Sequence, residues 1–583
     1  MRRVEEKSFR TFDGVELFYR HWPVERGAKS SGAIVLFHRG HEHSARMAHV
    51  VDELGLDEFE FFAWDARGHG RSPGPRGYSP SLGTSVRDVN DFVEYAATQA
   101  GCPVEDVAVI AQSVGAVLVS AWLHDYAPRI RCAVLASPAL KVKLYVPFAR
   151  TSLSLMQKLR GNFYVNSYVK AKFLTHDPAR IASYENDPLI SRPISVNILL
   201  ALYETAERIV ADANAITVPV QMLISGDDWV VHHGPQHEFF AKLGSPVKEQ
   251  HVIPGFFHDT LGERDRAPVL ERVKTFVRAR FAVPRPFVDL TDAHRSGATK
   301  EESDRLAAPL PALSPRGIYW GLTRASMKLG GALSDGIKLG HVTGFDSGST
   351  LDYVYRNEAG GTTPLGRMID RNYLDSIGWR GIRQRKVHVE ELLRIAMRRL
   401  RDGGRSVHVM DVAAGHGRYA LEAIDSAETR PDSILLRDYS EINVAAGAKL
   451  IEQKKLGDIA RFVKGDAFDR ASLAAVEPRP TLAIVSGLYE LFPDNEMVVR
   501  SLAGIADAVP LGGMLVYTGQ PWHPQLELIA RALTSHRGGA AWVMRRRTQG
   551  EMDQLVERAG FRKVAQRIDE WGIFTVSLAV RST

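Results

Sequence analysis

The fold of the first half of the chain is decided by one stretch, Val107-Ala108-Val109-Ile110-Ala111-Gln112-Ser113-Val114-Gly115. Its apolar, mostly β-branched start predicts a buried strand, and the helix-compatible segment 116–123 follows directly. A serine in such a strand–turn–helix setting needs small residues two positions before and after it, because their Cβ atoms would otherwise collide. Gly115 meets this requirement, and Ala111 stands where glycine is usual. We therefore predict a nucleophile elbow in a mostly parallel α/β sheet, with Ser113 as the nucleophile.

The other members of a serine triad are expected later in the chain, first the acid and then the histidine. The predicted strand 220–224 runs into Ser225-Gly226-Asp227-Asp228, and we predict Asp228 as the acid with Asp227 as the alternative. The predicted strand 248–253 is followed by a glycine-bearing loop that contains His258, the predicted base. His258 would take the proton of Ser113, while Asp228 would fix the imidazole tautomer.

A histidine-rich loop, His38-Arg39-Gly40-His41-Glu42-His43-Ser44, follows the predicted strand 33–37. An oxyanion hole uses one N–H from the residue after the serine and one from the loop after an early strand, so Val114 and Gly40 are the predicted donors. A metal site is the alternative interpretation of the three histidines. Because the loop lacks the i, i+4 ligand spacing of a helical zinc site, we predict no metal here.

These motifs, together with Trp64-Asp65-Ala66-Arg67-Gly68-His69-Gly70-Arg71-Ser72-Pro73-Gly74, resemble the monoacylglycerol lipase and lysophospholipase branch of the α/β-hydrolases over residues 5–283. The resemblance implies hydrolysis of carboxylic esters of monoacyl, lipid-like substrates, with a helical cap at about 140–215 forming the acyl tunnel. Arg39 replaces the glycine expected after His38, and Ala111 replaces the elbow glycine. Arg39 would either crowd the oxyanion loop or reach an anionic head group, so the substrate stays open.

Residues 139–176 of the predicted cap contain no acidic side chain. Such a basic and aromatic segment suits an anionic membrane surface, and the alternative is an ordinary solvated helix face. A peripheral contact with an anionic membrane and an ordinary solvated face are the two interpretations that stay open. The segment's basic residues are Lys141, Lys143, Arg150, Lys158, Arg160, Lys170 and Lys172, and its aromatic residues are Tyr145, Phe148, Phe163, Tyr164, Tyr168 and Phe173.

The second half of the chain begins a new alternation of strands and helices after a polar, proline-containing stretch. Predicted strands lie at 407–411, 434–436, 482–485 and 514–517, and an antiparallel pair at 563–567 and 574–578 closes the series. This order predicts a second doubly wound, Rossmann-like sheet. The expected organisation is a hydrolase domain at 1–283, a linker at 284–316, a helical preface at 317–402 and a second α/β domain at 403–583.

A glycine-rich turn, Asp411-Val412-Ala413-Ala414-Gly415-His416-Gly417, ends a predicted strand and opens a helix. Small residues let a ligand approach the backbone, and a helix N-terminus offers free N–H groups. Asp438 ends the next strand, where an acid about 20 residues past the glycines accepts ribose hydroxyls. Dinucleotide oxidoreductases share this pattern. An acid inside the turn, Asp411, would repel a pyrophosphate but suits the cationic amino acid end of S-adenosylmethionine.

Residues 403–581 resemble a class I S-adenosylmethionine-dependent methyltransferase. The segment 485–492 lacks the Asn/Asp-Pro-Pro-Tyr of enzymes that methylate amide or nucleobase amines, which argues against those acceptors. Tyr489, Glu490 and His523 are predicted to line the acceptor side, with core packing as the alternative for Tyr489. By position, the resemblance implies that the cofactor is bound by Asp411, Ala413, Gly415, Gly417, Asp438 and Asp466, the last at the adenine amino group.

Composition agrees with a multidomain globular protein. The chain has 583 residues, of which 45% are hydrophobic and 24% charged, so disordered and fibrous classes are excluded. Two cysteines, Cys102 and Cys132, cannot form a disulfide framework, and the sequence contains neither a signal peptide pattern nor a long uncharged apolar stretch. We expect a cytoplasmic protein, peripheral at most to the inner membrane surface.

The formal net charge of +6 does not by itself predict a nucleic acid partner. Basic runs occur at 380–386 and at Arg545-Arg546-Arg547, without an aromatic-interleaved RNA motif. We therefore expect these runs to face an anionic lipid or water.

The order of the two halves resembles a bacterial fusion of an α/β-hydrolase with a class I methyltransferase. It implies one enzyme with two sites that act on lipid-like molecules. The alternative is that the second half binds S-adenosylmethionine without transferring methyl, as a regulatory or scaffold module.

Overall fold

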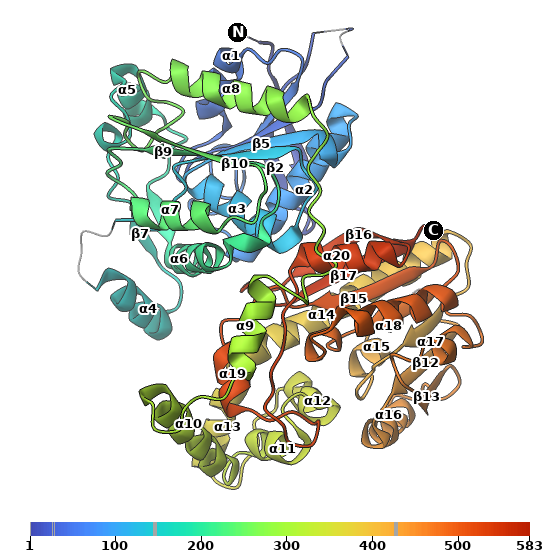
Figure 1. Cartoon of the computed structure of the whole chain (residues 1–583). Coiled ribbons are helices and arrows are strands. Elements are labelled where there is room, and N and C mark those ends of the chain that lie inside the picture. Colours follow the sequence, from blue (N-terminus) through green and yellow to red (C-terminus); the bar gives the residue numbers. More distant parts are fainter. Residues whose placement is uncertain (1, 26, 28, 144–147, 425–429) are drawn as a thin grey trace. The chain divides into compact units, whose positions relative to one another are not determined.

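The structure is a computed structural model that describes residues 2–25, 27, 29–143, 148–424 and 430–583. The chain divides into two compact units, Met1–Val288 (unit 1) and Asp289–Thr583 (unit 2), and each is described by itself (Figure 1). Across the described ranges, no helix has the combination of length and apolar character needed to cross a bilayer. Tyr145, one of the aromatic residues noted in the predicted cap, lies outside the described residues.

Unit 1 contains an eight-stranded sheet whose strands are parallel from β4 onward and antiparallel at the β1 edge. Its central strands are buried on both faces, which is why their sequences are continuous apolar runs. The order across the sheet is β1 (Glu5–Arg10), β2 (Glu16–Trp22), β4 (Glu60–Trp64), β3 (Ala33–Phe37), β5 (Val107–Gln112), β6 (Cys132–Ala136), β9 (Val220–Ser225) and β10 (Lys248–Ile253).

Helices cover both faces of this sheet (Figure 1). On one face, α1 (Ala48–Leu54) and α8 (Ala267–Phe281) share an apolar cluster with the strands. On the other face, α2 (Leu82–Ala100) packs against α3 (Val114–Tyr126), the helix that follows the elbow serine. Side chains alternate between the two faces of a strand, so both faces of β3 and β5 need a helical cover.

The range predicted for the cap lies between β6 and β9 and consists of short elements. Its last helix, α6 (Val196–Ala211), packs against α3, which connects this segment to the body of unit 1. The other helices and strands are α4 (Ala149–Arg160), β7 (Tyr164–Asn166), α5 (Pro178–Asn186) and β8 (Pro193–Ser195), together with two short 3-10 helices, Ala171–Phe173 and Ala213–Ala215. The helix α7 (His233–Lys242) follows β9.

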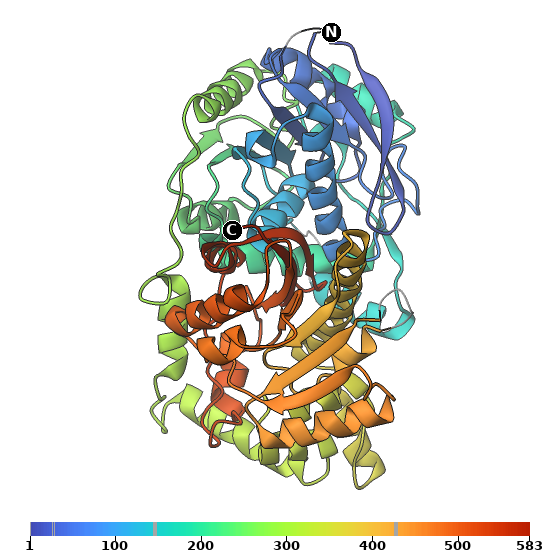
Figure 2. The same cartoon turned by 90° about the vertical axis from the view of Figure 1, so that its right-hand side faces the viewer.

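Unit 2 contains a seven-stranded sheet whose strands run in the same direction except β17, which pairs antiparallel with both of its neighbours, β15 and β16. Figure 2 shows its strands side by side, with helices packed beside them. The antiparallel pair predicted at the end of the chain is present as β16 and β17. The order is β13 (Ala460–Lys464), β12 (Ser433–Asp438), β11 (His408–Asp411), β14 (Leu482–Val485), β15 (Met514–Gly519), β17 (Thr575–Arg581) and β16 (Phe561–Ile568).

The helices of unit 2 fall into two groups. Those that connect the strands are α15 (Arg418–Glu422), α16 (Glu441–Gln453), α17 (Arg470–Ala474), α18 (Asn495–Ala508), α19 (Leu526–Ala532) and α20 (Gln549–Arg558). Those before the first strand are α9 (Ala298–Ala307), α10 (Pro315–Gly331), α11 (Asp335–Thr343), α12 (Gly348–Arg356), α13 (Pro364–Leu374) and α14 (Ile377–Asp402).

The predicted linker at 284–316 differs from the structure. Helix α9 lies inside it, and residues from Asp289 onward belong to unit 2. Leu306 is buried in the apolar cluster of the helical preface, and the Thr299 hydroxyl accepts a hydrogen bond from buried Arg545 at 3.1 Å. A polar helix with so few buried positions has little hydrophobic periodicity, so its sequence resembles that of an interdomain linker.

The expectation that Arg545, Arg546 and Arg547 face lipid or water is wrong. All three side chains are buried. Arg545 pairs with Glu551 at 2.6 Å, Arg546 pairs with Glu302, and Arg547 donates to the carbonyls of Tyr489 and Phe492. The three guanidinium groups therefore have a structural role. Each has five N–H donors and can satisfy several buried acceptors at once.

Candidate active sites

Ser113 lies in a strained turn between β5 and α3. Its backbone has φ 57° and ψ −118°, a conformation that L-residues rarely adopt. The turn is held because the Ser113 N–H donates to the Ala136 carbonyl at 2.9 Å. At Gly115, a Cβ atom would lie 2.5 Å from the His38 carbonyl oxygen, so glycine is required there. The local sequence therefore forms the elbow that the spacing predicts.

The three predicted triad residues come together at the ends of three strands. The Ser113 Oγ lies 2.7 Å from His258 Nε2, and His258 Nδ1 lies 2.7 Å from Asp228 Oδ2. All three side chains are buried, whereas Asp227 is exposed. The geometry therefore favours Asp228 over Asp227 as the acid partner of the histidine.

Asp228 is held in its ionised form. Burial would raise its pKa, but the His258 ring and the N–H groups of Val230 and Val231 hold the pKa below its ordinary value. An ionised carboxylate at this position orients the imidazole and stabilises its protonated form.

Gly40 and Val114, the predicted oxyanion donors, are neighbours. A Cβ atom on Gly40 would lie 3.1 Å from Val114 Cγ2, and both residues line the same cavity as Ser113. Within the described part of the chain, neither backbone N–H donates a hydrogen bond to a protein acceptor. The arrangement leaves two N–H groups beside the nucleophile, as stabilisation of an oxyanion requires.

Two of the three histidines of the loop after β3, His38 and His43, have separate protein partners. His38 Nδ1 donates to the Arg39 carbonyl at 2.6 Å, and His38 Nε2 accepts from the Ala66 N–H at 3.1 Å. His43 Nε2 lies 2.9 Å from Asp187 Oδ2. His38 and His43 thus hold the loop in place through their ring nitrogens.

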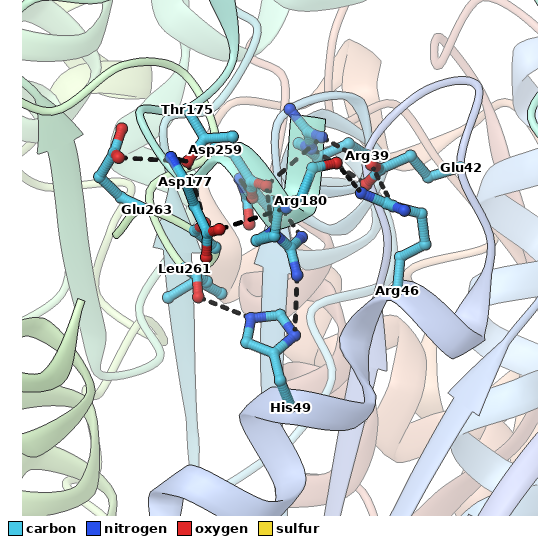
Figure 3. Close-up of polar contacts among 12 residues, drawn as sticks. Arg39, Glu42, Arg46, His49, Thr175, Asp177, Arg180, Asp259, Leu261 and Glu263 are labelled. Atoms are coloured by element: carbon cyan, nitrogen blue, oxygen red, sulfur yellow. Dashed lines mark hydrogen bonds and ion pairs between the residues drawn. The ribbon is translucent and has the colours of Figure 1, made fainter. Parts of the chain in front are cut away.

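The Arg39 guanidinium is held in an internal network of ion pairs. Its buried guanidinium donates to both carboxylate oxygens of Glu42, at 3.0 and 2.6 Å, and lies 3.6 Å from Asp259 (Figure 3). Asp259 also accepts two hydrogen bonds from Arg180 of α5 (Figure 3). Arg39 also belongs to the lining of the cavity at Ser113, so its positive charge beside the site is compensated by two carboxylates.

A cavity of about 670 Å³ leads to Ser113 and His258. Its walls are mainly apolar side chains of the segment between β6 and β9. Such a cavity suits an apolar chain that ends at the serine. The apolar lining includes Leu153, Val165, Leu174, Leu199, Leu202 and Tyr203.

The glycine-rich turn of unit 2 has the predicted geometry. Gly415 and Gly417 have φ values of 57° and 73°, and a Cβ on Gly417 would lie 2.4 Å from Leu436. The Gly415 N–H donates to Asp438 Oδ2 at 2.9 Å, while Asp438 Oδ1 accepts from Ser440 and Asn443. Asp438 is thus placed beside the turn, on the neighbouring strand β12.

Asp411, at the end of β11, is fully buried, and its Oδ2 has no hydrogen-bond partner among the described residues. Burial raises its pKa to about 7. A buried carboxylate oxygen without a donor is a group that a cationic ligand would satisfy. The residues therefore fit S-adenosylmethionine, whose ammonium and sulfonium groups are cationic.

The other predicted cofactor residues lie near strand ends. The Ala413 N–H donates to Asp411 Oδ1 at 3.2 Å, which shapes the turn. Asp466 follows β13, and its Oδ1 accepts from the Phe468 N–H at 2.9 Å.

Helix α12 covers the glycine-rich turn, and this contact is not predicted by the sequence. A Cβ on Gly415 would lie 3.4 Å from the Gly348 Cα, and Asp352 pairs with Arg418 at 2.7 Å. Gly348 follows Ser347, which caps α12. Such a cap and glycine predict a helix start, but not which turn the helix will cover.

The predicted acceptor residues divide into two groups. Tyr489 is packed in the core, with its hydroxyl donating to Ser501 at 3.0 Å. Glu490 and His523 line a second cavity of about 370 Å³ in unit 2. The packing alternative therefore holds for Tyr489 and not for the other two.

Two family models match the chain. The model described as "Putative methyltransferase" matches residues 273–581, and the model described as "Serine aminopeptidase, S33" matches residues 28–265. These matches confirm an α/β-hydrolase fold for the first half and a Rossmann-like methyltransferase fold for the second.

Similar proteins match either the whole chain or about half of it. A protein of Escherichia coli (strain K12) named Uncharacterized protein YnbC is 57% identical over 577 residues, 99% of this chain and 98% of that protein. The monoacylglycerol lipase of Mycolicibacterium smegmatis is 26% identical and covers 47% of this chain and 96% of its own. The solved monoacylglycerol lipase of Paleococcus ferrophilus shares 23% identity, covering 46% of this chain and 99% of its own, with a TM-score of 0.41.

Proposed function

Because the chain belongs to the family described as "Putative methyltransferase" and begins with a hydrolase of the monoglyceride lipase type, we propose that it is an enzyme with two sites. Unit 1 hydrolyses carboxylic esters of monoacyl, lipid-like substrates. Unit 2 binds S-adenosylmethionine and transfers its methyl group to a second molecule.

One observation carries the hydrolase proposal: the 2.7 Å hydrogen bonds from Ser113 to His258 and from His258 to Asp228 at the end of an apolar cavity. His258 Nε2 takes the hydroxyl proton as Ser113 Oγ attacks the ester carbonyl carbon. The N–H groups of Gly40 and Val114 receive the oxyanion that forms. His258 then protonates the leaving alcohol, and water attacks the acyl-serine by the reverse route.

The apolar cavity supports a lipid-like acyl group as substrate. Its lining side chains come mostly from α4, α6 and the residues between them. Because burial of each CH₂ contributes about 0.8 kcal/mol, an acyl chain gains affinity with length until the cavity is filled.

Replacing Ser113 tests the hydrolase proposal. In Ser113→Ala we expect hydrolysis of p-nitrophenyl butyrate and octanoate to fall by at least about 10³-fold, because the acyl-enzyme cannot form. Circular dichroism and thermal unfolding serve as the fold control. Unchanged hydrolysis by a folded Ser113→Ala protein would exclude the triad.

For unit 2, S-adenosylmethionine would be held by Asp411, Ala413, Gly415, Gly417, Asp438 and Asp466. When bound, it supplies an electrophilic methyl group. The chain's own contribution is a glycine-rich turn that allows close approach and a carboxylate without a partner, which favours a cationic ligand.

The alternative for unit 2 is a module that binds S-adenosylmethionine without catalysis. Calorimetric titration of the cofactor, followed by incubation with labelled S-adenosylmethionine and a bacterial lipid extract, separates the two proposals. Binding together with a labelled product supports the enzyme. Binding without any labelled product supports the regulatory or scaffold module.

A further inference from the structure

The cavity of unit 2 has one polar end and an apolar body. The polar groups lie where β14 and β15 end, since Glu490 follows β14 and His523 follows β15, and Arg385 of α14 reaches the same place. The body is lined by Met327, Ile337, Ile369, Trp379, Trp542 and Phe574. An amphiphilic ligand matches this division of polar and apolar surface.

The polar end lies at the same sheet edge as the glycine-rich turn. Asp411, the last residue of β11, is in register with Ile484 of the adjacent parallel strand β14. Open α/β sheets bind ligands outside the carboxyl ends of their strands, where the strand order reverses. Here β11 lies between β12 and β14, so the reversal falls between β11 and β14.

The charges at the polar end cancel. Arg385 Nη1 lies 3.4 Å from Glu490 Oε1, and both side chains are buried. Asp346, the other acid in the lining, is bound by Ser535 and His536. An ionic ligand would add an uncompensated buried charge, which is costly. The cavity therefore favours an uncharged ligand.

Hydrogen-bond donors and an acceptor face the ligand space together. His523 Nδ1 accepts from the Gln525 N–H at 3.0 Å, and burial lowers the pKa of His523 to about 3, so the neutral ring carries its proton on Nε2. Gly378 leaves this Nε2 uncovered, because a Cβ there would lie 3.1 Å from it. Gly487 likewise leaves Arg385 Nη2 uncovered, since its Cβ would lie at 3.0 Å.

The Arg385 guanidinium lies 3.4 Å from the Glu490 carboxylate, which only accepts, and His523 lines the same cavity. A hydroxyl group can accept a hydrogen bond from Arg385 or His523 and also donate one to Glu490. An ether or a carbonyl group can only accept, and an ammonium group can only donate.

We propose that this cavity binds the molecule that unit 2 methylates, and that this molecule is an uncharged alcohol or phenol with an apolar body. The inference rests on the proposed methyl transfer. Glu490 is placed to take the hydroxyl proton as the oxygen forms its bond to the methyl carbon. The electron pair of the broken carbon–sulfur bond stays with the sulfur of S-adenosylmethionine.

The outer face of the cavity wall points to a lipid bilayer as the source of this ligand. Helix α10, which lines the cavity through Met327 and Gly330, exposes Leu322 and Leu329, with 68% and 73% of their surface accessible. It contains three basic residues and no acidic one. Helix α13 lines the cavity through Ile369 and exposes Leu365 and Met368. An apolar face with basic residues is complementary to an anionic membrane, where apolar alcohols accumulate.

Binding of three decyl probes to the full chain tests the ligand class. We expect 1-decanol to quench tryptophan fluorescence with a Kd at least about tenfold lower than that of decanoate or decylammonium, because only the alcohol adds no buried charge. The quenching should be reduced in Trp379→Phe and Trp542→Phe. Equal or tighter binding of either ion, or no binding of decanol, would overturn the proposal.

Two variants test the position of the hydroxyl. Gly378→Leu fills the space beside His523 and should weaken decanol binding at least about tenfold, whereas Gly457→Leu, where a Cβ meets no atom within 4 Å, should leave it unchanged. Glu490→Gln leaves the charge of Arg385 without its partner. The ratio of the Kd of decanoate to the Kd of decanol should therefore fall by about tenfold or more. Unchanged selectivity in Glu490→Gln, or decanol binding by Gly378→Leu equal to wild type, contradicts the assignment.

Two further measurements complete the test. Vesicles of phosphatidylcholine and phosphatidylglycerol should bind the wild type more strongly than the double variant Leu322→Gln, Leu329→Gln, and equal binding would exclude the bilayer as the source. Calorimetric titration with S-adenosylmethionine reports the proposed function separately. Cofactor binding without decanol binding refutes only this inference, whereas decanol binding without cofactor binding refutes the proposed methyl transfer.

Discussion

At the scale of single residues, each site contains a group that the surrounding structure holds in an unfavourable condition. Ser113 occupies a strained backbone conformation, and Asp411 keeps an unpaired oxygen in the core of unit 2. Such costs persist only where the surrounding structure imposes them. Both features therefore mark places where a ligand is expected to interact.

The adjacent carboxylates Asp228 and Asp227 provide a matched pair of variants. We expect Asp228→Asn to lower kcat for ester hydrolysis by about 10³- to 10⁴-fold, because an amide no longer stabilises the His258 imidazolium. Asp227→Asn should stay within about twofold, since Asp227 is exposed and lies outside the hydrogen-bonded chain of Ser113, His258 and Asp228. Steady-state kinetics of both variants check this, and the reverse ranking would assign the acid to Asp227.

Burial raises the pKa of Asp411 to about 7, so the affinity for S-adenosylmethionine should depend on pH. The ionised form attracts the cationic ligand, and its population increases with pH, so the Kd should fall between pH 6 and pH 8. Calorimetry at several pH values measures this dependence. In Asp411→Asn the dependence should disappear and the affinity should be low throughout.

The same shift makes a prediction for the ligand-free protein. A carboxyl with a raised pKa binds more protons in the folded state than in the unfolded state, so its contribution to stability is lost as pH rises from about 4 to 7. Above pH 7, Asp411→Asn should therefore unfold at a higher temperature than the wild type. A lower unfolding temperature at pH 8 would contradict the assigned shift.

At the scale of elements, the first unit connects its catalytic loops to α5. Asp259, next to His258, accepts from Arg180 of α5 at 2.8 Å (Figure 3). It also accepts from Gln112, next to Ser113, at 3.0 Å. Arg39, next to Gly40, lies 3.6 Å from the same carboxylate. One buried carboxylate thus contacts neighbours of the nucleophile, of the base and of the oxyanion loop.

Helix α4 is the element most suited to a membrane in unit 1. None of its side chains is buried, and Leu155 and Leu159 expose 59% and 77% of their surface. We expect the double variant Leu155→Gln, Leu159→Gln to lose binding to anionic vesicles at all salt concentrations. The matched variant Lys158→Gln, Arg160→Gln should lose only the part of vesicle binding that depends on salt concentration, because salt screens the charges and not the apolar contacts. Co-sedimentation checks both, and binding equal to wild type would make α4 an ordinary solvated helix.

Patterns of elements were predicted well where a strand is buried on both faces. β3 and β14 are continuous apolar runs, and both were expected at their observed bounds. Helix α9 was missed because only Thr299, Ser303 and Leu306 of its residues are buried. A helix defined by so few core contacts has almost no hydrophobic pattern in its sequence.

At the scale of the whole molecule, each unit has its own sheet and its own apolar clusters. We therefore expect the two activities to be separable in the full chain. Asp438→Ala should abolish the heat of S-adenosylmethionine binding while kcat/KM for p-nitrophenyl octanoate stays within about twofold, and Ser113→Ala should do the opposite. Loss of esterase activity in a folded Asp438→Ala protein would show that the two sites depend on one another.

The sequence by itself determined the fold class of both halves and the chain order of Ser113, Asp228 and His258, because buried strands and glycine-bearing turns are written in consecutive residues. It also indicated the glycine-rich turn and Asp438. Only the tertiary structure decided that Arg39 is bound by Glu42 and Asp259, that Arg545 to Arg547 are buried, and that Arg385 and Glu490 form the polar end of a cavity. The physical reason is that the burial of a side chain and the pairing of its charge depend on partners distant in sequence, such as Glu490 for Arg385. A local sequence pattern does not predict such partners.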